Sequence, residues 1–187
     1  MATLRHNIAN IVSTSFTMVS LSLKKILYPK SLFFTGIQRF SPGVVVDTDS
    51  KSKIKLNSCV SMHSRCRLVA TCGGEVQIGC NTSFNVGCIV ISRSRIEIGK
   101  NVSVGPNVMM YDHDHIMESG CGALGNGYRL GEIVIGDNCW IGAGTIILLG
   151  THIGNNCVIA AGSIVKGEVP DNTVLIQKRT GMYKGVE

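Results

Sequence analysis

The stretch that decides the fold is residues 135–165, which read IGDNCW IGAGTI ILLGTH IGNNCV IAAGSI V when they are divided into sixes. A bulky aliphatic residue opens each six, and a small residue stands four positions after it. A six-residue period is neither helical nor that of a single strand, and it describes one flat face of a triangular coil. Three faces make a coil of about 18 residues, and successive coils stack about 4.8 Å apart. The segment therefore predicts a parallel β-helix.

The same double pattern begins at residue 78, and Asp114 is the one exception at a small position. Weaker matches at residues 54–57 and 66–68 predict degenerate first coils. Glycine and then Asn or Asp follow several bulky residues, as in residues 136–138, which suits tight corners with left-handed backbone angles. The predicted bulky inward residues are Ile78, Phe84, Val90, Ile98, Val104, Met110, Ile135, Ile141, Ile147, Ile153, Ile159 and Val165. The predicted small inward residues are Thr82, Cys88, Ser94, Val102, Val108, Cys139, Thr145, Thr151, Cys157, Ser163 and Val169.

Composition narrows the class of protein. A chain of 187 residues can bury a core without cross-links. Its eight Cys residues contain no CxxC pair, so we expect free thiols in a reducing cytosol, with Cys88, Cys139 and Cys157 packed inward. The net charge of +6 is dispersed and lacks interleaved aromatic residues, which argues against nucleic-acid binding. An anionic small ligand or an acidic membrane surface explains the charge at least as well.

The N-terminal region differs from the repeat. Residues 1–27 carry apolar side chains at near-helical spacing, which predicts an amphipathic helix ended by Pro29. Its apolar face either caps one end of the core or lies on a membrane as a peripheral contact, with Lys24, Lys25 and Lys30 at the surface. No apolar run reaches the roughly 18 residues of a membrane span, so we expect a cytoplasmic protein, with membrane association as the alternative. The predicted divisions are a helical segment (1–40), a β-helix domain (41–175) and a tail (176–187).

The repeat breaks between Met110 and Ile135. The string Tyr111-Asp112-His113-Asp114-His115 stands at the point of departure, and a Gly-rich stretch follows it. An interruption at one place in a repeat usually carries a loop, and loops carry function. We therefore expect one protruding loop at residues 116–131.

This interrupted repeat resembles the hexapeptide-repeat acyltransferases, and the resemblance covers about residues 54–175. It implies a left-handed parallel β-helix, whose handedness the period alone cannot give. The segment 107–115 is similar to capsule and lipopolysaccharide O-acetyltransferases, and the coil before it to maltose- and galactoside-type O-acetyltransferases. A count without gaps from Asn107 puts His115 at the family's catalytic position. The resemblance also implies acetyl-CoA as co-substrate, no metal, and a homotrimer with its sites between subunits.

The chemistry suits an imidazole. An acyl thioester is already activated, and a His side chain with a pKa of about 6.5 can take the proton of an attacking hydroxyl near neutral pH. Asp112, Asp114 or a backbone carbonyl could fix the ring tautomer. Two alternatives stay open. Both His residues could be solvated loop residues, or His113, His115 and one Asp could bind a metal, although a third His is missing from any neighbouring coil.

The resemblance implies roles for further residues. Asn85 would orient the acceptor, although an ordinary corner Asn explains it too. Trp140 would line the acyl-CoA tunnel, although packing alone could account for it. The remaining candidates are Tyr111, Asp112 and His113 for the acceptor, Gly142, Ala160 and Lys166 for CoA, and Lys178 and Arg179 for the CoA phosphates.

The sequence therefore predicts an acetyl-CoA-dependent O-acetyltransferase acting on a hydroxyl of a sugar or polysaccharide precursor, with Asn85 and His115 as its catalytic residues. Three alternatives remain. An N-acetyltransferase would act on an amino sugar or antibiotic. A gamma-type carbonic anhydrase would need three His ligands on adjacent coils, and His63 and His152 lie far from the loop in sequence. A structural or binding β-helix would favour an uninterrupted repeat.

Overall fold

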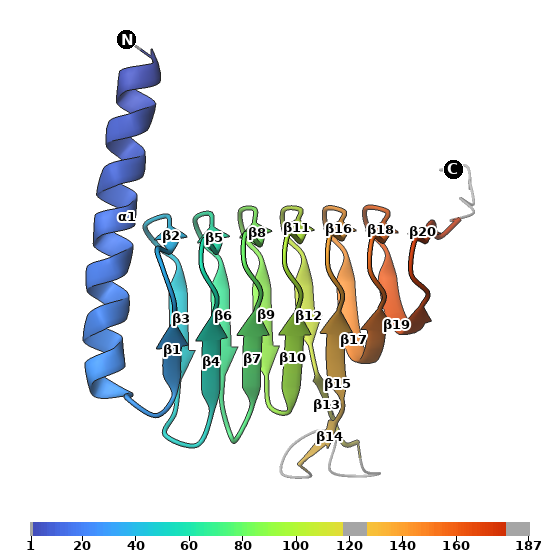
Figure 1. Ribbon diagram of the computed structural model, residues 1–187. Coiled ribbons are helices and arrows are strands. Elements are labelled where there is room, and N and C mark those ends of the chain that lie inside the picture. The colour runs from blue at the N-terminus through green and yellow to red at the C-terminus, as the bar shows by residue number, and fades with distance from the viewer. Residues whose placement is uncertain (1, 118–126, 179–187) are drawn as a thin grey trace, which may run out of the picture.

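The computed structural model describes residues 2–117 and 127–178, with the backbone alone for residues 2–11. Short parallel strands wind into a solenoid, and one long helix, α1 (Ala2–Leu27), lies across its first coil (Figure 1). The predicted parallel β-helix with an N-terminal helix is confirmed. No helix among the described residues is long and apolar enough to cross a membrane.

Each coil contributes a strand to each of three faces, and each strand pairs in parallel with its equivalent in the next coil. One sheet has the order β2-β5-β8-β11-β16-β18-β20. A second sheet covers the other two faces without a break, because β17 bends around the corner between them and pairs with both β12 and β15. The strands before the loop are β1 (Leu32–Phe34), β2 (Arg39–Phe40), β3 (Val45–Thr48), β4 (Lys53–Leu56), β5 (Ser61–Met62), β6 (Arg67–Ala70), β7 (Glu75–Ile78), β8 (Ser83–Phe84), β9 (Ile89–Ser92), β10 (Arg95–Ile98), β11 (Ser103–Val104) and β12 (Met109–Tyr111). The strands after the loop are β15 (Glu132–Ile135), β16 (Trp140–Ile141), β17 (Ile146–Ile153), β18 (Val158–Ile159), β19 (Ile164–Val169) and β20 (Val174–Leu175).

The core consists of the residues that the repeat selected. All the predicted bulky residues are buried, and equivalent ones pair across coils, as Val104 does with Phe84 on one side and Ile141 on the other. The predicted small residues are also buried, with one error. Ser94 is half-buried, and Ser92 is buried in its place because the chain bends at residues 93–94 before β10 begins. The coils therefore bury alternate bulky and small layers, as in other stacked-coil folds.

The corners follow the predicted chemistry, with a different role for glycine. Asn138 and Asn156 have φ angles of 58° and 55°, and the side-chain amide of Asn138 donates to that of Asn156 at 3.2 Å. Gly136 is required by clearance instead, since a Cβ there would lie 2.7 Å from the backbone of Gly154 in the next coil. Asn residues supply the left-handed angles at these corners, glycines such as Gly144 and Gly162 supply them at others, and Gly136 allows its coil to stack closely.

Helix α1 caps the open end of the first coil. Leu21 is buried in the core, and the Thr17 hydroxyl donates to the Phe40 carbonyl at 2.9 Å while it accepts from the Phe40 N–H at 2.8 Å. The Lys24 ammonium donates to the Val46 carbonyl at 2.6 Å. One face of the helix thus closes the core, as one of the two predicted alternatives required.

The solenoid starts at Leu32, ahead of the predicted boundary at residue 41. Leu32 pairs with Ile54 of the next coil, so β1 is a true first-coil strand. The buried residues Leu32 and Phe40 are eight positions apart, and a six-residue period does not detect that spacing. The weak matches at 54–57 and 66–68 overlap β4 and β6.

The interruption has an ordered base. Strands β13 (His113–His115) and β14 (Tyr128–Leu130) form an antiparallel pair that projects from one edge of the solenoid (Figure 1). Residues 118–126 of the predicted loop, and the predicted tail from residue 179 onward, lie outside the described part of the chain.

The described cysteines carry free thiols. Cys88, Cys139 and Cys157 are buried at small inward positions, as predicted. Burial raises the pKa of the Cys139 thiol, which disfavours the reactive thiolate. These cysteines pack as small apolar residues.

Candidate active site

One corner of the solenoid aligns several predicted residues in a single row. Each member directly follows a bulky residue of the β2–β20 sheet, and its backbone N–H donates to the carbonyl of the equivalent bulky residue one coil further on, at 2.8–2.9 Å. We call this row the corner column. Its members are, in coil order, Ser41, His63, Asn85, Gly105, Gly142 and Ala160.

A groove of about 180 Å³ runs along part of this column. The Asn85 side-chain oxygen accepts from the Val86 N–H at 2.7 Å, and within the described residues no hydrogen bond holds its amide nitrogen. Trp140 is 58% exposed and pairs in register with Ser103. The structure thus brings Asn85 and Trp140 to one groove, and their roles as acceptor and acyl-CoA contacts stay predictions. The full lining is His63, Ser83, Phe84, Asn85, Ser103, Val104, Gly105 and Trp140.

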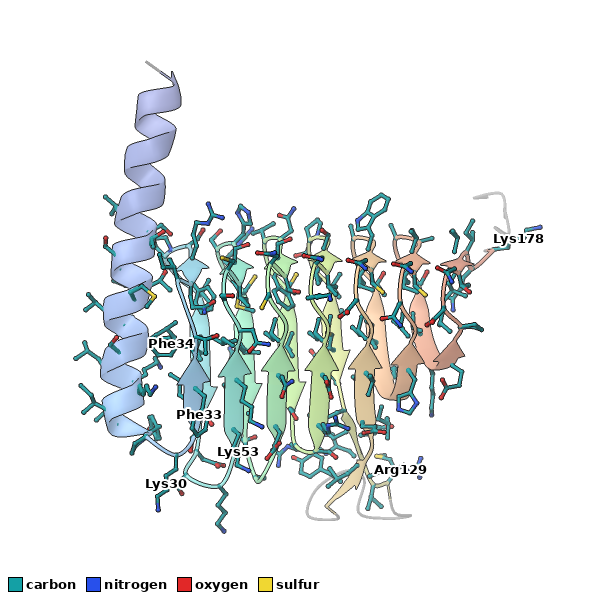
Figure 2. All side chains as sticks on the ribbon, in the orientation of Figure 1. Lys30, Phe33, Phe34, Lys53, Arg129 and Lys178 are labelled. Carbon is teal, nitrogen blue, oxygen red and sulfur yellow. The ribbon has the colours of Figure 1, made fainter. Side chains whose placement is uncertain are left out.

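The column beyond Asn85 carries no side chain larger than a methyl group. Gly142 cannot be larger, because a Cβ there would lie 2.5 Å from the backbone nitrogen of Ala161. This part of the column forms a narrow strip. From Asn85 to Ala160 the strip spans three coil steps, or about 14 Å at the usual strand spacing. A narrow strip beside an exposed indole leaves room for a thin, extended ligand. Lys178 follows β20 at the far end of the solenoid, beside the edge that carries the column (Figure 2).

Asp112 anchors the opposite edge of the solenoid. Its carboxylate is completely buried and accepts from the Ser92 hydroxyl at 2.5 Å, the Arg93 N–H at 2.8 Å and the Ser94 N–H at 2.9 Å. It also lies 3.0 Å from Nδ1 of His113. These contacts favour the role of orienting an imidazole, and they leave no exposed oxygen for the acceptor contact that was predicted for Asp112.

The two His residues that follow have different surroundings. His113 is largely buried, and the contact of its Nδ1 with Asp112 orients the ring and leaves Nε2 outside that contact. The His115 ring is exposed, and its centroid lies 4.7 Å from that of Tyr128, its partner in the β13–β14 pair. Within the described residues no hydrogen bond holds a ring nitrogen of His115. His113 is therefore the oriented imidazole, and His115 is the accessible one.

Sequence reasoning missed two residues at this edge. Tyr128 contacts both imidazoles, with its ring centroid 5.4 Å from that of His113. The Arg93 guanidinium lies over the Tyr128 ring, 3.9 Å from its centroid. Tyr111, which was predicted, lies edge-on to His113 at 6.3 Å. We call the group Arg93, Tyr111, Asp112, His113, His115 and Tyr128 the loop edge.

A single chain does not bring the two groups together. Figure 1 shows β8, β11 and β16 at one edge of the solenoid and β13 and β14 at the opposite edge. Lys166 is a predicted CoA contact. Its neighbour Val165 pairs with Ile147, and the residue after Ile147, Leu148, pairs with Tyr111 of the loop edge. Lys166 thus lies with the loop edge, away from Gly142 and Ala160.

The alternative metal site has no support in the geometry. Among residues 2–117 and 127–178, no three His, Cys, Asp or Glu side chains gather closely enough to hold a metal ion. Imidazole acid–base chemistry is what the His residues of the loop edge can perform.

Comparisons with known proteins agree with the fold and the repeat. Residues 132–166 match the family model described as the hexapeptide repeat of succinyl-transferase. A galactoside O-acetyltransferase of Lactococcus lactis is 35% identical over 102 residues, which cover 54% of this chain and 49% of that protein. The predicted likeness to hexapeptide-repeat acyltransferases, with their left-handed β-helix, is confirmed.

Solved structures show the same likeness. A maltose O-acetyltransferase from Clostridium difficile superposes with a TM-score of 0.52 and 33% identity, over 75% of this chain and 64% of that one. A galactoside acetyltransferase in complex with coenzyme A gives a TM-score of 0.51 and 29% identity, over 70% and 58% of the two chains. The chain spans about half the length of the curated relatives it matches.

Proposed function

We propose that this chain transfers an acetyl group from acetyl-CoA to a hydroxyl group of a sugar or polysaccharide precursor. The observation that carries the proposal is that one edge has a groove that continues into a strip of glycine and alanine, while the opposite edge has an oriented imidazole, His113, beside an accessible one, His115. The galactoside and maltose O-acetyltransferases to which the chain is similar support both the donor and the acceptor class.

The working unit in this proposal is a homotrimer. Because Asn85 and His115 lie on opposite edges of one chain, a site that uses both needs the loop edge of one subunit beside the corner column of another. Parallel packing of three solenoids around one axis forms three such contacts, each with the same two edges.

The residues of the corner column hold the donor, whose thioester supplies an already activated acetyl group. Gly142 and Ala160 leave room for its pantetheine arm, Trp140 flanks it, and Lys178 offers a positive charge to its phosphates. Arg179, the second predicted cation, lies outside the described residues. The free amide nitrogen of Asn85 donates to the acceptor.

His115 acts as the general base. As the acceptor oxygen forms its bond to the acetyl carbon and the carbon–sulfur bond breaks, His115 takes the hydroxyl proton and returns it to the departing thiolate. The rival base is His113, whose contact with Asp112 is the geometry that commonly orients a catalytic imidazole. Tyr128 touches both rings and sets their separation.

Thiol release from acetyl-CoA tests the reaction and the choice of base. With a panel of sugars and amino sugars, we expect His115→Ala to lose about 100-fold or more in turnover, and His113→Ala to lose less. Full activity in His115→Ala together with loss in His113→Ala would transfer the role to His113. Release with amino sugars alone would change the acceptor to an amine, and no acetyl-CoA binding by calorimetry would end the acetyltransferase proposal.

Mixing two inactive variants tests the shared site. Co-assembled His115→Ala and Asn85→Ala subunits should regain about a quarter of wild-type activity, because random mixing joins the two intact edges at one contact in four. Each variant alone is the control. No recovery from co-assembled trimers would place both residues in a site within one subunit.

A further inference from the structure

Helix α1 has a second apolar face that the rest of the chain leaves uncovered. Its inner face carries Thr17 and Leu21, which are only 2% exposed against the first coil. Its outer face carries five large apolar side chains that are 58–75% exposed. We call this set the outer stripe. It consists of Val12, Phe16, Val19, Leu23 and Ile26.

The outer stripe is continuous, and all of it except one flank of Phe16, which lines a small pocket with Phe40 and Val46, faces away from the solenoid. Its members alternate in steps of four and three residues, which places them along one line of a helix. Figure 1 shows α1 lying across the end of the coil stack, so the face opposite Leu21 points outward along the solenoid axis. Uncovered apolar surface of this extent in a soluble domain usually marks an interaction site.

The positive charge of the chain is concentrated in the same segment. The first 46 residues contain five Lys and Arg and no Asp or Glu, and the first acidic residue is Asp47. The remainder contains 18 − 5 = 13 basic and 12 acidic residues, a net charge of +1 out of +6. The apolar stripe and the excess positive charge therefore coincide at one end of the molecule.

We propose that α1 docks on an anionic lipid surface through the outer stripe. An apolar helix face with cations beside it lies in the plane of a membrane interface, and each component adds to binding. Lys30 is exposed just beyond the helix and projects away from the coils (Figure 2). Lys24 adds less, because its ammonium is held by the Val46 carbonyl.

The competing occupant is a second copy of the chain. Steps of four and three residues also describe a coiled-coil seam, and the part of the stripe with described side chains, Val12 to Ile26, covers about two heptads. Its flanking positions are serines without the opposite charges that select a partner helix. Two copies would also bring two +5 segments together. Charge complementarity therefore favours lipid.

Vesicle flotation of the full chain tests the docking. We expect binding to phosphatidylcholine vesicles that contain phosphatidylglycerol, little binding to phosphatidylcholine alone, and release by salt. The double variant Phe16→Gln/Leu23→Gln keeps helix-forming residues and should bind about tenfold less. Val174→Gln/Ile176→Gln, which removes two similarly exposed apolar residues from the opposite end, should bind like the wild type. Circular dichroism and thermal melting check that each variant folds.

Two variants that each remove one positive charge sharpen the test. Lys30→Gln should weaken binding to the anionic vesicles about fivefold, the effect of one cation near such a surface, whereas Lys178→Gln at the other end should not. Equal binding to both lipid compositions, or unchanged binding by the stripe variant, would overturn the proposal. So would a stripe variant that lowers the oligomeric state without lowering lipid binding. Acetyl transfer to soluble acceptors should be unchanged in the stripe and Lys30 variants, so failure here is distinct from failure of the proposed reaction.

Discussion

The corner column and the loop edge are built by different forces. In the corner column, every residue is placed by a backbone hydrogen bond to the next coil, and the repeat fixes which residue stands there. In the loop edge, the β13–β14 pair holds the backbone of His113 and His115, and one buried carboxylate and ring contacts with Tyr128 orient their side chains. The column should therefore tolerate the loss of an exposed side chain but not added volume, and the loop edge should depend on single side chains.

Loss of the Asp112 carboxylate should have the largest effect. Asp112→Ala leaves the Arg93 and Ser94 N–H groups without their acceptor, whereas the Ser92 hydroxyl can still donate to the Glu75 carbonyl at 3.0 Å, and the change should lower the free energy of unfolding by about 3 kcal/mol. Turnover should fall as well, since the His113 ring loses its orienting partner. Denaturant titration and thiol-release kinetics measure the two effects.

The exposed neighbour Asp114 provides the matched control. Its carboxylate accepts from the His115 N–H at 2.8 Å, so Asp114→Ala should lower stability by no more than about 0.5 kcal/mol. If Asp112→Ala were as stable as Asp114→Ala, the loop edge would not depend on this anchor.

Added volume in the corner column should come next. In Gly142→Ala the new Cβ would lie 2.5 Å from the Ala161 nitrogen, and the stacked backbone must shift, which should lower stability by about 2–3 kcal/mol. Gly150→Ala meets no atom within 4 Å but keeps a φ of +76°, so it should lose about 1 kcal/mol. Thermal unfolding of both variants separates the cost of contact with the next coil from the cost of a positive φ angle. Equal losses of stability would show that close stacking does not limit side-chain size in the column.

The repeat made much of the column predictable. A residue that follows a bulky inward position must lie at a corner, so the period places Asn85, Gly142 and Ala160 before any coordinates are known. His63 obeys the same rule and was missed because Met62 and Phe84 are 22 residues apart, which is not a whole number of sixes. Longer early coils hide equivalent positions from a six-residue count.

The loop edge was predictable in position but not in its contacts. The broken period located residues 111–115, yet nothing in the sequence joins Arg93 or Tyr128 to them. Those contacts depend on where the chain returns to the solenoid after the interruption. Burial of Asp112 could not be predicted either, because a lone Asp at a break in a repeat is ordinarily solvated.

Removal of the exposed indole should affect binding and leave stability unchanged. Trp140→Ala should raise the KM for acetyl-CoA about tenfold, because the ring flanks the proposed donor strip, while the free energy of unfolding changes by no more than about 0.5 kcal/mol. Ile164→Ala, which shortens another exposed side chain of the same solenoid, is the control for nonspecific effects. An unchanged KM would remove Trp140 from the donor site and leave the column a structural corner.

The smallest expected effect concerns His152, which lies on β17 where that strand pairs with β15. Hydrogen bonds to Glu168 and then to Glu132 raise the pKa of His152 above its usual 6.5. A raised folded-state pKa means that the stabilisation is complete below about 6.5 and disappears as the pH rises through the folded value. Because these side chains are exposed, we expect roughly a few tenths of a kcal/mol.

Thermal melting of wild type and His152→Gln between pH 5.5 and 8.5 measures this effect, with Glu168→Gln as the matched control. At pH 5.5 the wild type should be slightly more stable than His152→Gln, and this difference in stability should shrink toward pH 8.5. A difference that grows with pH would contradict the raised pKa of His152. Glu132 opens β15, where the chain re-enters the solenoid after the interruption. If turnover stays equal in these variants, Asp112 and Tyr128 suffice to place the imidazoles. If turnover follows the titration of His152, strand β15 also helps to position the imidazoles of His113 and His115, and the loop edge then includes the start of β15.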